Sequence, residues 1–142
     1  MMNLTLLVAA LALGAPALKD PPKKQASILG EWVADQCTVG GKPIPLDGTA
    51  IGWTFSADGA VALVNNGRTL DTHHFLADTK ASPATVDLNS QKAQECYLCT
   101  FKVEGDTLTL NVGWIGAGRP TAFECPAGSK CTLYVLKRVK KD

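Results

Sequence analysis

The residues of this 142-residue chain with the most chemical potential are five cysteines: Cys37, Cys96, Cys99, Cys125 and Cys131. In an oxidising compartment such a set predicts disulfides, with one thiol left over. Cys125 and Cys131 are the first candidate pair, because the Pro- and Gly-containing residues 126–130 can turn the chain back between them. A second bridge would join Cys37 to Cys96 or Cys99, and the spacing leaves open which of these two stays free.

Two more specific roles for the cysteines, a redox site and a zinc site, fit the surrounding residues less well. Cys96 and Cys99 have the Cys-x-x-Cys spacing of redox proteins, but they lie in a strand-like stretch. On a strand, residues three apart point to opposite faces, with Cα atoms about 10 Å apart. Cys125 and Cys131 could complete a four-thiolate zinc site with this pair, but Tyr97-Leu98 lacks the Gly or Pro that a zinc knuckle needs. We therefore expect neither a redox site nor a metal site, and no cofactor.

His73 and His74 are the remaining candidates for acid/base or metal chemistry. As neighbours on a strand they face opposite ways, whereas Asp71 and His73 share a face. We interpret this stretch as an exposed, polar strand surface rather than a site. No Gly-x-Ser-x-Gly motif occurs in the chain. The sequence therefore predicts that the protein is not an enzyme.

The first seventeen residues have the pattern of an export signal. An apolar run of about ten residues ends at Ala15-Pro16-Ala17, the small-x-small pattern of a signal-peptidase site. The run is shorter than the roughly 20 residues that cross a membrane, and no later stretch is longer. We expect a cleaved signal peptide at 1–17, an exposed lead-in at 18–27, and a secreted or periplasmic protein without a membrane span. The net charge of +1 and the scattered basic residues argue against a nucleic-acid partner.

One folded domain is expected over residues 28–139, followed by a tail at 140–142. Short β-prone runs alternate with turn residues such as Asp58-Gly59 and Asn65-Asn66-Gly67, and no long stretch has helical periodicity. About eight strands at this spacing are typical of an up-and-down barrel or a sandwich. The expected strands are 31–37, 51–56, 60–64, 68–75, 85–88, 95–103, 107–112 and 132–139.

Gly30-x-Trp32 in the first strand and Arg138 in the last resemble the Gly-x-Trp and late Arg of lipocalin-type barrels, in which the Arg stacks on the Trp. The chain as a whole resembles a family of uncharacterised lipocalin-like domains from exported planctomycete bacterial proteins. The resemblance implies an all-β, single antiparallel up-and-down β-barrel of about eight strands, with no established activity, and the chain departs from the family in its larger number of cysteines. The further motifs are Gly41-Lys42-Pro43-Ile44-Pro45, Phe55-x-x-Asp58-Gly59, residues 78–83 with Val86-Asp87-Leu88, Gly105-Asp106-x-Leu108-x-Leu110, Arg119-Pro120-x-x-Phe123 and Tyr134-x-Leu136-Lys137-Arg138.

An eight-stranded barrel is just wide enough to be filled by its own side chains or to hold one small ligand. The large aromatics favour a filled interior. Trp114 and Ile115 lie in a glycine-rich loop, where they could gate the mouth of a cavity or, as we expect, rest on the edge of the core. We predict a module that binds a small apolar molecule or a peptide. The alternative is a disulfide-stabilised structural or interaction module with a filled core, whose partner is an extracytoplasmic protein. The expected ligand-binding side chains of the interior are Trp53, Phe55, Leu63, Phe101 and Leu110.

Overall fold

Nine antiparallel strands make up the computed structural model, which describes residues 27–90 and 95–140. The expected signal peptide at 1–17 and the lead-in up to residue 26 lie outside the described residues. No helix that could cross a membrane occurs in the described part of the chain. The strands are β2 (Gly30–Val39), β3 (Lys42–Pro43), β4 (Ile51–Phe55), β5 (Ala60–Asn65), β6 (Arg68–Asp78), β7 (Ala84–Ser90), β8 (Cys96–Glu104), β9 (Thr107–Gly113) and β10 (Cys131–Arg138).

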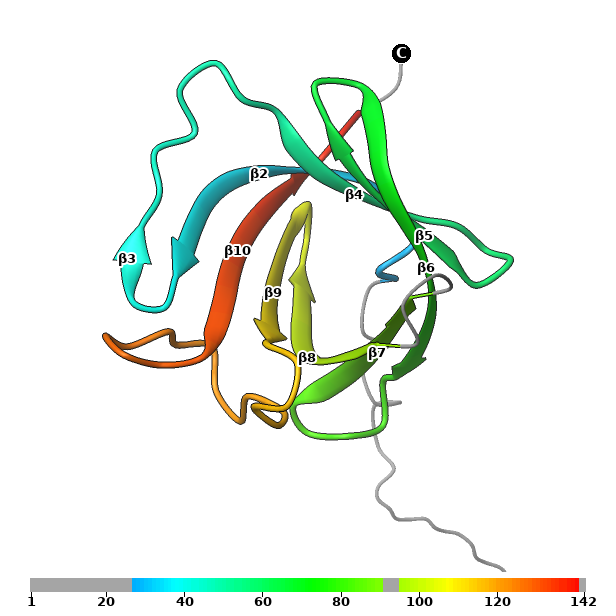
Figure 1. The fold of residues 1–142 in the computed structure, drawn as a ribbon. Coiled ribbons are helices and arrows are strands. Elements are labelled where there is room, and N and C mark those ends of the chain that lie inside the picture. Colours follow the sequence, from blue (N-terminus) through cyan, green and yellow to red (C-terminus); the bar gives the residue numbers. More distant parts are fainter. Residues whose placement is uncertain (1–26, 91–94, 141–142) are drawn as a thin grey trace, which may run out of the picture.

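Eight of these strands close into a barrel. From β4 to β10 each strand pairs with the next along the chain, β2 pairs with β4, and β10 returns to pair with β2. Figure 1 shows β10, in red, lying beside β2, in blue. The predicted all-β, up-and-down barrel is therefore confirmed. The two-residue strand β3 was not predicted; it pairs only with the end of β2, at Thr38 and Val39.

The turn between β5 and β6 shows why the strands end where they do. Asn66 and Gly67 have φ values of 52° and 80°, a left-handed conformation that Asn and Gly tolerate better than other residues. The Asn66 side chain also accepts a hydrogen bond of 2.8 Å from the amide of Ala50. The turn thus orders the start of β4 as well as joining its own two strands.

The two ends of the barrel differ. One end, which we call the Arg138 end, carries the start of β2, the end of β10 and the short β8–β9 turn at Gly105. The other, which we call the loop end, carries the connections 44–50 and 114–130. Since long connections collect at only one end, the two mouths of the barrel have different surroundings.

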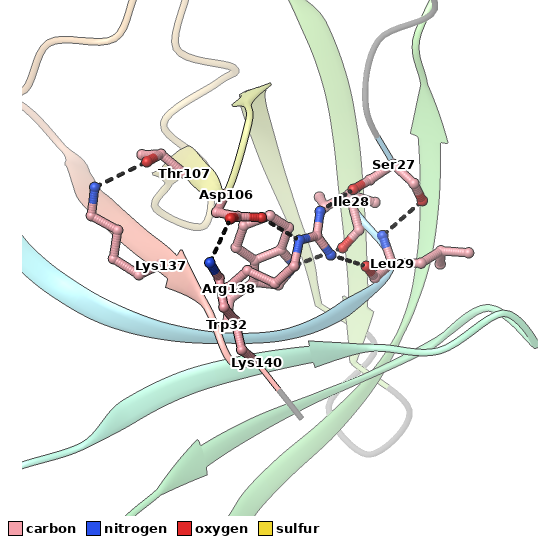
Figure 2. Close-up of polar contacts among 9 residues, drawn as sticks. All are labelled: Ser27, Ile28, Leu29, Trp32, Asp106, Thr107, Lys137, Arg138 and Lys140. Atoms are coloured by element: carbon pink, nitrogen blue, oxygen red, sulfur yellow. Dashed lines mark hydrogen bonds and ion pairs between the residues drawn. The ribbon is translucent and has the colours of Figure 1, made fainter. Parts of the chain in front are cut away.

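Trp32 closes the Arg138 end, as Figure 2 shows. The indole is 2 % exposed, and its Nε1 donates a hydrogen bond of 2.8 Å to the carbonyl of Ile28. The Arg138 guanidinium lies over the ring, with Cζ 4.2 Å from the centroid. Arg138 also pairs with Asp106, at 3.4 Å, and donates to the carbonyl of Leu29. The first strand, the last strand and the β8–β9 turn therefore meet around Trp32 and Arg138. We call these two side chains the plug of the barrel.

Gly30 permits this arrangement. It has a φ of 121°, and a Cβ there would lie 3.0 Å from the Arg138 guanidinium. A side chain at this position would be strained by the backbone and crowded by the arginine. The Gly-x-Trp tripeptide is thus explained by the contact between Arg138 and Trp32.

The interior next to this plug is solid. Phe55 and Phe101 are 2 % and 1 % exposed, and Phe55 packs edge-on against Phe75 at a centroid distance of 5.1 Å. Burying aromatic and aliphatic side chains on this scale supplies most of the free energy that holds a small barrel together. The other fully buried members of the core are Val61, Val86, Leu88, Cys99, Leu108, Leu110 and Leu136.

The connection 114–130 is held against the outside of the barrel by Asn111. This side chain is fully buried, and its Nδ2 donates to the carbonyls of Ala122, at 2.8 Å, and Glu124, at 3.0 Å. Arg119 adds a second attachment, through the carbonyl of Cys99 and the carboxylate of Asp87. Specific side-chain contacts therefore hold the connection 114–130 in a defined place on the barrel.

Replacing Asn111 by alanine should lower the free energy of unfolding by about 2–3 kcal/mol, because it leaves two loop carbonyls without their donor. Urea denaturation followed by circular dichroism measures this change. The matched control is Thr109→Ala, on the same outward face of β9 and half-buried; we expect it to cost less than about 1 kcal/mol. Equal costs for the two variants would contradict the role given to Asn111.

Candidate functional site

His73 lies inside the barrel, so the prediction of an exposed polar strand surface is wrong for this residue. The imidazole is 4 % exposed, and its Nε2 lies 3.3 Å from the Asp71 carboxylate. Its ring packs edge-on against Tyr97 at 5.8 Å. His74, the next residue, is exposed as expected.

A β-bulge in β6 is the reason why His73 faces the interior. In the β5–β6 ladder Leu63 pairs with Asp71 and Val64 pairs with Thr69, which leaves Leu70 as an extra residue on β6. The bulge sets the phase in which Asp71, His73 and Phe75 point inward, while Leu70 and Leu76 are 57 % and 72 % exposed. Judged by hydrophobicity alone, Leu70 and Leu76 would define the buried face.

Buried polar atoms without partners distinguish the loop-end half of the interior. Within the described residues, five buried side-chain atoms have no hydrogen-bond partner. Three of them, Nδ1 of His73, Nε1 of Trp53 and Oδ1 of Asn65, belong to the interior, whereas Oγ1 of Thr100 and Oδ1 of Asn111 lie on the outward faces of β8 and β9. The three interior side chains belong to the inward face of β4, β5 and β6, as their register with Leu63 and Val61 shows. Leaving such atoms unpaired costs about 1–3 kcal/mol each, so they need an explanation.

Tyr134 faces this region from β10 on the opposite wall. Its ring meets that of Trp53 edge-on, at a centroid distance of 5.9 Å. Burial, followed by the nearby thiols of Cys37 and Cys99, raises the pKa of Tyr134 to about 12. The phenol is therefore neutral at physiological pH and can donate or accept a hydrogen bond.

Most of the residues predicted to bind a ligand belong to the packed core. Trp53, Phe55, Phe101 and Leu110 are members of one buried cluster, and Leu63 is half-buried and packs against it. From this cluster the Trp53 ring reaches Tyr134. His73, Asp71 and Tyr134 were not predicted to belong to the site. Their types were visible, but the facing of β6 depends on a bulge that local patterns do not reveal.

The five cysteines are free thiols, and none of them is paired at disulfide distance. The predicted disulfides are therefore not formed in this structure. Cys96 is exposed and Cys99 is buried, because they lie on opposite faces of β8. Burial raises the pKa of Cys99 to about 12. Among the described residues, no group of three or more His, Cys, Asp or Glu side chains could hold a metal ion.

Trp114 lies outside the interior, at the loop end. It is 39 % exposed, its Nε1 donates to the Thr132 hydroxyl at 3.0 Å, and its ring comes close to Gly40. Several hollows also lie on the outer surface. One of about 680 Å³ is bordered by the 116–131 segment, and one of about 430 Å³ lies over the outer faces of β2, β4 and β5.

No protein-family model, curated protein or solved structure matches this chain.

Proposed function

We propose that the protein binds a small, mostly apolar molecule in the loop-end half of the barrel, and that this molecule carries both a hydrogen-bond donor and an acceptor. The observation that carries the proposal is the pair of buried, unpartnered polar atoms on the inner wall, Nδ1 of His73 and Nε1 of Trp53. A folded protein keeps such atoms where a ligand or an ordered water completes them. The resemblance to lipocalin-like barrels supports the same conclusion.

Asp71 sets the chemistry of His73. A neutral imidazole that donates Nε2–H to this carboxylate leaves a lone pair on Nδ1. Nδ1 then accepts a hydrogen bond from the ligand, while the Trp53 Nε1–H donates one to it. Tyr97 and Tyr134 add aromatic surface that suits a planar, apolar body.

Export of the domain is part of the proposal. The apolar run and the small-x-small end of residues 1–17 support it, and they lie outside the described residues. A second candidate function is a ligand-free interaction module, favoured by the solid packing of Phe55 and Phe101.

Fluorescence titration separates the two candidates. The probes are 1-aminoanthracene, which has a hydrogen-bond donor, and anthracene, which has the same rings without one. We expect 1-aminoanthracene to bind more tightly, by about tenfold, which is the value of one buried hydrogen bond. No binding of either probe would favour the ligand-free module, and equal affinities for the two probes would contradict the role given to the unpartnered polar atoms. Native mass spectrometry of protein purified from its own host provides an independent readout, because a retained small molecule would appear as added mass.

Replacing His73 by phenylalanine should weaken 1-aminoanthracene binding by about tenfold, since the ligand loses its acceptor. It should leave anthracene binding unchanged. The matched control is His74→Phe, at the exposed neighbouring position, for which we expect no change with either probe. Thermal unfolding of each variant checks that the barrel is intact. A His73→Phe protein that is folded and binds both probes like the parent would contradict the site.

A further inference from the structure

We propose that Cys125 and Cys131 form a redox-active dithiol that exchanges with small disulfides, in which Cys125 is the attacking thiol and Cys131 the resolving thiol. This inference concerns the loop that ends at β10, and it does not depend on ligand binding inside the barrel.

The two sulfur atoms flank one hydroxyl group. Ser129 Oγ lies 3.4 Å from the Cys125 sulfur and 3.3 Å from the Cys131 sulfur. A turn closed by a 3.0 Å hydrogen bond from the Ser129 amide to the Pro126 carbonyl folds the intervening residues back on themselves. The thiols are therefore adjacent without being bonded, and movement of the Ser129 hydroxyl opens the space between them.

Most of the polar groups around Cys125 stabilise its thiolate, whereas the Cys131 carbonyl, to which the Cys125 thiol donates at 3.1 Å, favours the protonated form. Burial opposes ionisation, but hydrogen bonds from Ser129, from Cys131 and from the amides of Gly41 and Gly40 outweigh it and lower the pKa of Cys125. In the thiol state the Ser129 hydroxyl donates to the Pro126 carbonyl at 2.6 Å, and a rotation redirects it to the sulfur once Cys125 is ionised. Burial raises the pKa of Cys131. The pKa is thus lowered for Cys125 and raised for Cys131, which is the difference expected between an attacking and a resolving cysteine.

The glycines at the β2–β3 turn make this environment possible. Gly40 and Gly41 have φ values of 57° and 92°, which point successive amides toward the loop. A Cβ on Gly41 would collide with the backbone of Ala127, so only glycine lets the two segments approach this closely. A further contact, from the Gly128 amide to the Gly40 carbonyl at 3.1 Å, fixes the loop in place.

The two thiols also differ in how accessible they are to a reagent in solution. Cys125 is half-buried and can meet a reagent, whereas Cys131 is 6 % exposed and reacts best from within the protein. The hollow of about 680 Å³ described above is lined by Glu124 and Pro126, the neighbours of Cys125, and by Cys131. It offers room for the second half of a small disulfide.

The exchange balances in two steps. The Cys125 thiolate attacks one sulfur of the small disulfide; a new sulfur–sulfur bond forms, the old one breaks, and the first leaving thiolate takes up a proton. Cys131, as it loses its proton, then attacks the Cys125 sulfur and releases the second thiol. Two electrons pass from the protein dithiol to the reagent, which ends as two free thiols.

The experiment treats the reduced full-length chain with oxidised glutathione at pH 7 and maps the products by mass spectrometry. Cleavage after Lys130 separates Cys125 from Cys131, so a bridge between them appears as two linked peptides. We expect this bridge, and we expect Cys131→Ser to accumulate a glutathione adduct on Cys125 instead. A bridge from Cys125 to Cys37, whose sulfur also lies near it, or the absence of any bridge, would overturn the assignment.

Alkylation by iodoacetamide provides the second readout. At pH 7 Cys125 should react about tenfold faster than the more exposed Cys96, because a larger share of it is thiolate. Ser129→Ala should slow the reaction of Cys125 several-fold, and Cys96→Ser, the matched control, should leave the Cys125–Cys131 bridge and the reaction rate of Cys125 unchanged. Modification of Cys96 before Cys125 would overturn the proposal even if Ser129→Ala did not fold.

Discussion

Replacing Trp32 by alanine is expected to lower the free energy of unfolding by about 3–5 kcal/mol, the range found when a fully buried large aromatic is truncated. The side chain is 2 % exposed and belongs to the core, so its removal opens a cavity inside the Arg138 end of the barrel. It also removes the hydrogen bond to the Ile28 carbonyl and the surface on which the Arg138 guanidinium rests. Urea denaturation followed by far-ultraviolet circular dichroism measures the loss.

The matched control is Trp114→Ala, which removes the same side chain from a position that is 39 % exposed. We expect it to cost less than half as much, because most of the cost of truncation comes from buried surface. A double-mutant cycle with Arg138→Ala should give a coupling of about 1–2 kcal/mol, in the range of a partly desolvated cation–π contact. If Trp32→Ala lowers the free energy of unfolding no more than Trp114→Ala does, Trp32 does not close the Arg138 end of the barrel.

The barrel should lose about 4 kcal/mol of stability between pH 9 and pH 12 through Cys99 alone. Burial raises the pKa of this thiol from 9.0 to about 12. A group whose pKa is raised by folding supports the native state fully below its unfolded pKa, and that support is lost as the pH rises toward its folded pKa. Between these values the unfolded thiol releases a proton that the folded thiol keeps, so the free energy of unfolding falls by about 1.4 kcal/mol per pH unit.

Tyr134 adds to the same loss of stability at alkaline pH, over a narrower pH range. Burial raises its pKa from 10.0 to about 12, so its share, about 3 kcal/mol, is lost between pH 10 and pH 12. We therefore expect the decline to steepen above pH 10.

Urea denaturation at a series of alkaline pH values tests both residues. Cys99→Ala should flatten the decline between pH 9 and pH 10, where Cys99 contributes before Tyr134, and Tyr134→Phe should flatten it above pH 10. Cys96→Ser, at an exposed position, should keep most of the decline. If the stability of Cys99→Ala falls as steeply as that of the parent from pH 9, the thiol is not held neutral by the fold.

The local sequence was enough to predict the strands and their order. Turn residues such as Asn66 and Gly67 take the positive φ values that tight hairpins need, and apolar residues alternate along most of the strands between them. These signals depend only on nearby residues, so they can be interpreted without a fold. The alternation in β9 is of this kind, because Leu108, Leu110 and Val112 all face the interior.

The inward facing of the polar residues of β6 could not be predicted in the same way. The stretch with Asp71, His73 and His74 was interpreted as an exposed, polar strand surface, yet the bulge at Leu70 sets the phase in which His73 faces the interior. A bulge arises from pairing with the neighbouring strand, and a side-chain period of two means that a one-residue shift reverses every side chain. Only the ladder between β5 and β6 decides which face is inside.

The sequence by itself therefore determined an all-β chain with a Gly-x-Trp start, a late arginine and five cysteines, and the resemblance to lipocalin-like domains favoured a barrel over a sandwich. Only the tertiary structure decided what those residues do. It places His73 beside Asp71 inside the wall, and it brings Gly40 and Gly41 to Cys125, more than eighty positions further along the chain. The physical reason is that the turns and strand alternation are set by neighbouring residues, whereas a buried polar atom or a stabilised thiolate acquires its surroundings only when distant strands pair.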